Sequence, residues 1–164
     1  MGTHAFDFSL ANVADGPDPF TLSELPDDVA FVVLFFQRDH YCPRCRNQVQ
    51  NLAERIDAFH ERDAEVVSIV PETVERVREW QSNYDLPYPL LADPDASVAD
   101  TYEQPVRFGL LGSFSDFLGR MPEVVIVDRR GDEPELAYVY RGSSTFDRPS
   151  IDDLLTELDE LLET

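Results

Sequence analysis

The sequence contains no lysine, and its 13 strongly basic residues are all arginine, against 33 aspartate and glutamate residues. The formal net charge is therefore −20 at pH 7. So acidic a surface repels the phosphates of nucleic acids and the headgroups of anionic membranes, and we expect neither as a partner. An acidic chain without lysine resembles proteins of extreme halophiles, because molar salt shortens the Debye length to about 3 Å and weakens like-charge repulsion. The alternative is an acidic protein from a mesophile.

Long apolar runs are also missing. No segment approaches the ~20 residues that a membrane-spanning helix needs. The opening stretch, MGTHAFDFSLANVADG, has acids where a secretory signal would have a basic region and a long apolar run. We therefore expect a cytoplasmic protein. Its 164 residues and 43% hydrophobic content predict one folded domain over residues 1–164.

Cysteine is scarce, because Cys42 and Cys45 are the only two and lie two residues apart. In the cytoplasm such a pair is more often catalytic or metal-binding than structural. Structural zinc needs four ligands, and the histidines at positions 4, 40 and 60 lack the spacing of a zinc-binding histidine pair. A glycine-rich phosphate loop is absent as well. We expect a redox pair and no metal, flavin or nucleotide cofactor, with a metal site or inert packing cysteines as the alternatives.

Strand and helix patterns alternate along the chain and predict an α/β fold. Strand patterns occur at Val29–Phe36, Glu65–Val70, Val124–Val127 and Leu136–Tyr140. The first is a continuous apolar run of the kind that is buried on both faces of a sheet, and the last is expected to pair antiparallel. Pro71 is expected to open a helix, and Ser150 to cap the final helix. These patterns predict a mixed central β-sheet with helices on both faces.

The two cysteines follow the first buried run, at the start of a predicted helix. An apolar stripe at helical spacing begins at Cys45 and continues through Val49, Leu52, Ile56 and Phe59. A thiol at a helix N-terminus ionises more readily, because the macrodipole and the free backbone N–H groups favour an anion. Cys42 lies nearer the mouth of the helix, whereas Cys45 belongs to the buried stripe. We therefore assign Cys42 as the attacking thiolate and Cys45 as the resolving thiol.

Several stretches resemble the thioredoxin-fold superfamily and, within it, the peroxiredoxin-like branch related to alkyl hydroperoxide reductase and thiol-specific antioxidant proteins. They are FDFSL…FTLSEL, FFQRDHYCPRCRNQ, YDLPYPLLADPDASVADTY, MPEVVIVDRRG and DRPSIDDLL. The resemblance implies a thioredoxin-like fold with a cis-proline, Pro122, facing the cysteine pair. It also implies a peroxide or protein disulfide as substrate and a thioredoxin-like or other dithiol as reductant.

The active-site pattern of standard peroxiredoxins, Pro-x-x-x-Thr-x-x-Cys with a distant arginine, is incomplete here. Laid over this sequence, its Pro, Thr and Cys fall on Arg38, Cys42 and Cys45. The distant arginine falls on Met121, and Arg120 one residue away is the candidate for its role. By this overlay Cys45 would react with peroxide, which conflicts with the assignment of Cys42.

The buried aspartate that thioredoxins carry ahead of their cysteines is missing too, because the strand ends in Phe35, Phe36 and Gln37. His40 and Glu123 are candidates for moving the proton, with a plain structural or solvated role as the alternative for each.

Together these features predict a thiol-dependent antioxidant oxidoreductase. It would reduce peroxides, disulfides or both through a Cys42–Cys45 dithiol/disulfide cycle, with Pro122 and Arg120 completing the catalytic site. The alternative is a non-catalytic module that uses the pair as a redox sensor or a zinc clip. The apolar segment Pro105–Gly119 is expected to pack in the core, with a cover over the site or a homodimer surface as alternatives.

Overall fold

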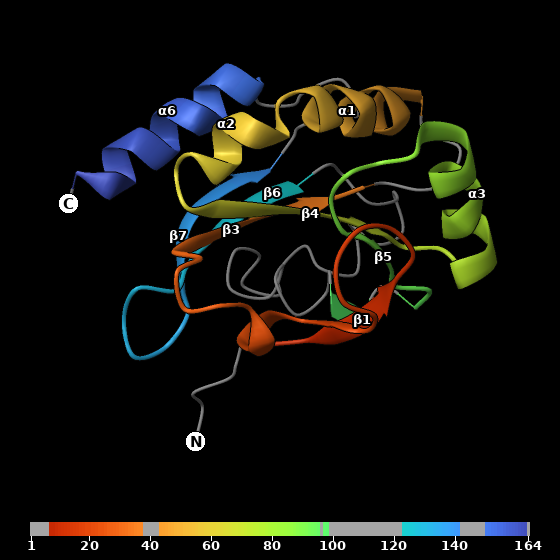
Figure 1. Ribbon diagram of the computed structural model, residues 1–164, viewed down its shortest axis with the longest axis horizontal. Helices are drawn as coiled ribbons and strands as arrows, with labels where there is room; N and C mark the ends of the chain where they lie inside the picture. Colours follow the sequence, from red (N-terminus) through yellow and green to blue (C-terminus); the bar gives the residue numbers. More distant parts are fainter. Residues whose placement is uncertain (1–6, 38–42, 96, 99–122, 142–149, 164) are drawn as a thin grey trace.

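The computed structural model describes residues 7–37, 43–95, 97–98, 123–141 and 150–163, and for residues 43–46, 123 and 141 the backbone only. A 7-stranded mixed sheet with the order β2-β1-β5-β4-β3-β6-β7 forms its centre (Figure 1). The strands are β1 (Ser9–Asn12), β2 (Phe20–Thr21), β3 (Phe31–Phe36), β4 (Ala64–Val70), β5 (Leu90–Ala92), β6 (Glu123–Asp128) and β7 (Glu135–Arg141). The helices are η2 (Leu22–Glu24, a 3₁₀ helix), α1 (Pro43–Glu54), α2 (Ile56–His60), α3 (Val74–Tyr84) and α6 (Ile151–Leu162).

The middle of the sheet is β3, which pairs parallel with β4 and antiparallel with β6. Every residue of β3 is buried, and none is more than 5% exposed. Successive side chains enter opposite cores, as strand geometry requires: Phe31, Val33 and Phe35 on one face, and Val32, Leu34 and Phe36 on the other. The expectation of a strand buried on both faces is confirmed, although the strand begins at Phe31 rather than Val29.

Helical segments cover both faces of the sheet. We call the core that contains Phe31, Val33 and Phe35 the first core, and the core on the opposite face the second core. Side chains of α1, α2, α3 and α6 join the first core, and Figure 1 shows α1, α2 and α6 together above the sheet. Leu22 of η2 and Val98, in a helical turn at residues 97–98, join the second core beneath it. The antiparallel pairing of β7 with β6 is confirmed as well. The mixed α/β architecture expected from the sequence is therefore present.

The apolar stripe lies on the sheet side of the helices that follow the cysteines. Val49, Leu52 and Phe59 are fully buried, and Ile56 is 9% exposed. The stripe does not run along one continuous helix, because Arg55 leaves helical geometry with φ −115° and ψ 12° and separates α1 from α2.

Two helix starts were expected, at Pro71 and after Ser150. The Pro71 expectation is wrong, because α3 begins at Val74 and Pro71 lies in the bend before it. The Thr73 hydroxyl accepts a hydrogen bond from the Arg76 backbone N–H at 3.4 Å, and a proline side chain cannot cap a helix in this way. Ser150 is confirmed as the cap of α6, since its hydroxyl accepts from the Asp153 backbone N–H at 3.0 Å.

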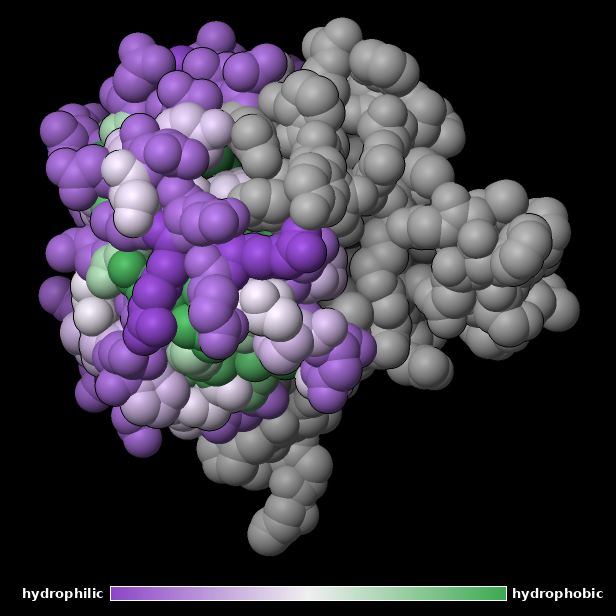
Figure 2. Space-filling model, turned by 90° about the vertical axis from the view of Figure 1, so that its right-hand side faces the viewer, coloured by the Kyte–Doolittle hydropathy of each residue, from purple (hydrophilic) through white to green (hydrophobic). Residues whose placement is uncertain are grey.

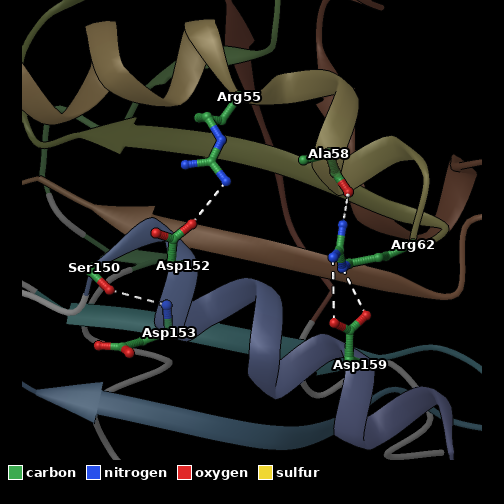
Figure 3. A network of polar contacts seen from close by, with 7 residues as sticks. All are labelled: Arg55, Ala58, Arg62, Ser150, Asp152, Asp153 and Asp159. Atoms are coloured by element: carbon green, nitrogen blue, oxygen red, sulfur yellow. Dashed lines mark hydrogen bonds and ion pairs between the residues drawn. The ribbon is translucent and has the colours of Figure 1, made fainter.

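Arginines connect the C-terminal helix to the region of α2 (Figure 3). Arg62 makes a two-pronged contact with the Asp159 carboxylate, at 2.8 and 3.3 Å, and also donates to the Ala58 carbonyl at 2.7 Å. Arg55, at the break between α1 and α2, contacts Asp152 at 2.9 Å. These contacts hold α6 beside the helices that follow the cysteine motif.

The described residues on the face shown in Figure 2 are mostly hydrophilic (purple), with smaller apolar areas (green) between them. Among the described residues, Leu162 is the one large hydrophobic side chain that is exposed, at 40%. Within the same ranges no helix is long and apolar enough to cross a membrane.

Candidate redox site

The motif begins where β3 ends. After Phe36, the Gln37 backbone N–H donates to the Ile69 carbonyl at 2.8 Å and extends the contact between β3 and β4 by one residue. Cys42 and His40 lie outside the described residues. The backbone of α1 begins at Pro43 and includes Cys45 in its first turn. A buried strand thus leads into a helix that carries the second cysteine at its N-terminal end.

The segment before β6 reaches the same end of the sheet. Glu123, the first residue of β6, pairs with Phe36, the last residue of β3. Pro122 and Arg120 lie outside the described residues, as does the segment Pro105–Gly119. The chain therefore leaves β3 and enters β6 at the same end of the sheet. The pairing therefore brings two distant parts of the sequence to one place.

The start of α1 is electropositive in a chain that is otherwise acidic. Its first turn contains no acid, and no acid occurs between Asp39 and Glu54. Arg44 and Arg46 lie on either side of Cys45 in the sequence. The positive end of the helix dipole is thus not neutralised by a carboxylate within the helix, and this favours ionisation of a thiol there.

A buried chain of polar side chains lies beneath α1. Gln37 is 2% exposed, Ser68 is fully buried and Tyr88 is 1% exposed. The Gln37 Nε2 atom lies 3.4 Å from the Ser68 hydroxyl, which lies 3.1 Å from the Tyr88 hydroxyl. Tyr88 in turn donates to the backbone carbonyl of Val49, at 3.2 Å. Gln37 directly follows β3, Ser68 is in β4, Tyr88 lies in the segment before β5, and Val49 is in α1.

Burial raises the pKa of Tyr88 well above its ordinary value, and the hydrogen bond with Ser68 lowers it by a smaller amount. The Tyr88 hydroxyl is therefore a protonated donor at any physiological pH. In the sequence, Gln37 stands out only as one of the residues found where thioredoxins carry a buried aspartate. A weak signal for Ser68 was available, since it is a polar residue within the apolar run of β4.

Histidine and acidic clusters do not form a metal site in the described part of the chain. No group of three or more histidine, cysteine, aspartate or glutamate side chains there could hold an ion. His60 instead lies 3.3 Å from the Glu65 carboxylate, with a side chain 49% exposed. The positions of His4 and His40 are outside the described residues.

The strand order, with a buried central strand leading into the helix of the cysteine motif, defines a thioredoxin-like fold of the peroxiredoxin type. The reduced 2-Cys peroxiredoxin of Plasmodium vivax superposes with a TM-score of 0.76 at 17% identity, over 96% of this chain and 93% of that chain. The peroxidoxin BcpB of Mycobacterium tuberculosis superposes with a TM-score of 0.70 at 23% identity, over 94% of this chain and 93% of that chain.

Residues 1–132 match the AhpC/TSA family, and the chain belongs to that family. Peroxiredoxin Bcp of Bacillus subtilis (strain 168) is 22% identical over 104 residues. That match spans 62% of this chain and 63% of the relative, slightly under two thirds of its length.

The fold expected from the sequence is confirmed, and the family is the one that the sequence motifs resemble. The roles of Cys42, Cys45, Pro122 and Arg120 stay predictions. So do the halophilic origin and the cytoplasmic location.

Proposed function

We propose that this protein is a thiol-dependent antioxidant enzyme that reduces peroxides, disulfides or both with electrons from Cys42 and Cys45. The observation that carries the proposal is the first turn of α1, which contains Cys45, has no acid and follows a buried central strand in a chain of the AhpC/TSA family. A helix end of this kind stabilises a thiolate.

The peroxide reaction proceeds in balanced steps. The Cys42 thiolate attacks a peroxide oxygen, the O–O bond breaks, and the departing alkoxide takes a proton and leaves as the alcohol. Cys42 is thereby oxidised to a sulfenic acid. The Cys45 thiol then attacks the Cys42 sulfur, the S–O bond breaks, water leaves, and a Cys42–Cys45 disulfide forms. An external dithiol of the thioredoxin type reduces this disulfide and becomes oxidised itself.

Pro122 and Arg120 complete the catalytic site at the same end of the sheet. The pairing of Glu123 with Phe36 supports them, because the segment that ends at Pro122 joins the sheet beside the end of β3. Pro122 faces the cysteine pair, and Arg120 provides positive charge for the thiolate and the bound peroxide. An Arg120→Lys variant that keeps peroxidase activity, beside an inactive Arg120→Met variant, would support the role of charge.

Peroxide and disulfide substrates are separated by two assays on the purified protein. The first follows hydrogen peroxide consumption with a dithiol donor, and the second follows reduction of the insulin disulfides. Activity in either assay, lost in Cys42→Ser, supports the catalytic cycle, whereas inactivity in both rejects it. If the parent binds one zinc ion per chain and Cys42→Ser binds none, the cysteine pair is a zinc site rather than a redox centre.

The order of the cysteines is tested by trapping. A mixed disulfide with substrate accumulates in Cys45→Ser if Cys42 attacks first, because the resolving thiol is gone. The double variant Cys42→Ser/Cys45→Ser is the control for background thiol chemistry. A Cys42→Ser protein that reacts faster with peroxide than Cys45→Ser does would reverse the assignment.

The setting we propose is a cytoplasm of high salt, and its support is the charge of −20 without lysine. We also propose a homodimer. Sedimentation in molar salt tests the dimer, and a monomer at micromolar concentration would exclude it.

A further inference from the structure

The turn after β6 contains an arginine that is held by backbone carbonyls. Arg129 directly follows β6, and its side chain donates to the carbonyl oxygens of Leu25, Pro26 and Val29, at 3.1, 3.0 and 2.6 Å. The segment before β3 therefore surrounds one side of the guanidinium group. In the part of the chain that the structure describes, this side chain makes no other hydrogen bond and no ion pair.

The Arg129 guanidinium group has unused donors and an unpaired charge. All three of its contacts come from the Nη1 and Nη2 atoms, so the Nε N–H has no acceptor within the described ranges. Arg62 and Arg130, by contrast, each bind an aspartate carboxylate through two nitrogens. Because hydrogen bonds from a guanidinium group to an anionic acceptor are the strong ones, Arg129 can bind a carboxylate from outside the chain.

The same arginine lines a hollow of about 150 Å³ at this end of the molecule. The other lining residues are Asp7, Leu22, Ser23, Gly131, Asp132 and Pro134. Leu22 is fully buried, and with Pro134 it gives the hollow an apolar part. A cavity of this volume can hold a molecule of the size of benzene. The hollow therefore has room for a small organic ligand.

Two carboxylates line the hollow as well. The Asp7 Oδ1 atom accepts from the backbone N–H groups of Phe8 and Ser23, each at 2.9 Å, and these bonds hold the carboxylate in place. Its Oδ2 atom and both carboxylate oxygens of the exposed Asp132 have no partner among the described residues. The hollow thus presents one positive group and two negative groups that are not paired with it.

These charges select the class of ligand. A simple anion would meet Arg129, but also two carboxylates and a chain of net charge −20. A simple cation would meet the guanidinium group. A molecule that carries both charges and has no net charge avoids both repulsions, and it can satisfy the groups of both signs.

We propose that this hollow binds a small free amino acid as a zwitterion. The carboxylate of the ligand accepts from Arg129, and its ammonium group donates to Asp7 and Asp132. A small apolar side chain of the ligand lies toward Leu22 and Pro134.

The site lies at the opposite end of the sheet from the cysteine motif. Asp128, directly before Arg129, pairs with Phe31 at the start of β3, whereas the motif follows Phe36 at the end of that strand. The strand between them spans about 17 Å. Figure 1 shows the loop between β6 and β7 at the left and the start of α1 at the right. Amino acid binding is therefore independent of the proposed redox function.

The test is an NMR chemical-shift titration of the full chain, with the backbone amides of Ser23 and Gly131 as reporters. Alanine is the probe, because it has as many non-hydrogen atoms as benzene and a small apolar side chain. We expect it to saturate one site per chain with a dissociation constant of about 1 mM. Acetate lacks the ammonium group and ethylamine lacks the carboxylate. Each should bind about 10- to 150-fold more weakly, which corresponds to one lost hydrogen bond to a charged group.

Substitutions in the hollow should change the affinities in opposite directions. The double variant Asp7→Asn/Asp132→Asn should bind alanine more weakly and acetate more tightly, because the carboxylates that repel an anion are gone. The asparagine oxygen at position 7 can still accept the two backbone N–H groups. Arg129→Met should bind alanine more weakly and ethylamine more tightly. A general loosening of the fold would weaken the binding of every probe.

Two variants outside the hollow are the matched controls. Glu133→Gln removes an exposed acid next to Asp132, and Arg78→Met removes an exposed arginine from α3. Both should bind alanine as the parent does, and so should Cys42→Ser, whatever the peroxide and insulin assays show.

Thermal unfolding shows which variants are folded, and Asp132→Asn alone, at an exposed position, decides if the others are not. Three results overturn the proposal: no saturable binding of alanine, equal affinities for alanine and acetate in the parent, or a loss in Glu133→Gln as large as in the aspartate variants. Shifts confined to amides away from the hollow overturn it as well. Alanine binding in a protein without redox activity would reject the catalytic cycle and keep this site.

Discussion

The Tyr88 hydroxyl donates a hydrogen bond of 3.2 Å to the backbone carbonyl of Val49, and so connects the segment before β5 to α1. Both residues are buried, at 1% and 0% exposure. The bond fixes the helix of the cysteine motif against the sheet at a point within the apolar core.

Removing this hydroxyl is expected to destabilise the protein. Tyr88→Phe deletes the donor to Val49 and removes one hydrogen-bond partner of the buried Ser68 hydroxyl, at a cost of about 1–3 kcal/mol in the free energy of unfolding. Urea unfolding measures the change. Tyr84→Phe, on α3, should change it by much less, and equal losses in both variants would contradict the special role of the buried chain.

The same tyrosine should make stability depend on alkaline pH. Burial raises its pKa in the folded protein above the ordinary tyrosine value of about 10, so the stabilisation is complete below about pH 10 and is lost as the pH rises above it. Above that pH the unfolded chain loses the Tyr88 proton and the folded chain keeps it. The free energy of unfolding should therefore fall by about 1.4 kcal/mol per pH unit more steeply in the parent than in Tyr88→Phe. Parallel pH profiles would exclude this coupling.

The contact between Arg62 and Asp159 should contribute a small, salt-sensitive stabilisation. Asp159 is 52% exposed and Arg62 is 24% exposed, and pairs of this kind typically contribute about 0.2–1 kcal/mol. Asp159→Asn removes the pair but also relieves repulsion among the acids of the chain. Glu160→Gln, the neighbouring position, removes the same charge and serves as the matched control. Asp159→Asn should lower the free energy of unfolding more than Glu160→Gln does, and this difference should shrink in molar salt. Equal free energies of unfolding for the two variants at low salt would show that the pair contributes nothing.

Salt is expected to stabilise the whole protein. A formal charge of −20 repels itself, and molar salt shortens the Debye length from about 10 Å at 0.1 M to about 3 Å. The midpoint of urea unfolding should therefore rise steadily between about 0.1 M and about 1 M potassium chloride. Sucrose is the control for effects that do not depend on charge. A midpoint that responds to sucrose but not to salt would argue against the halophilic interpretation.

Much of the fold could be predicted because its signals are local. The apolar run of β3, the spacing of Val49, Leu52 and Phe59, and the serine cap of α6 each lie within a short stretch, and the structure confirms them. The start of α3 was predicted wrongly, because two nearby residues are both suited to begin a helix. Pro71 and Thr73 both suit a helix start, and the threonine hydroxyl, which can accept a backbone N–H, begins α3.

In the candidate site, too, some features follow from the sequence and others only from the tertiary structure. The sequence by itself determined the Cys42–Cys45 pair, its place after a buried strand, and the lack of acids between Asp39 and Glu54, because these depend on residue type and spacing alone. Only the tertiary structure decided that Gln37, Ser68, Tyr88 and Val49 form one hydrogen-bonded chain. Their positions are separated by up to 51 residues, being 37 and 88 at the extremes. A hydrogen bond needs its atoms within about 3 Å, and only the parallel pairing of β3, β4 and β5 beneath α1 brings these side chains that close.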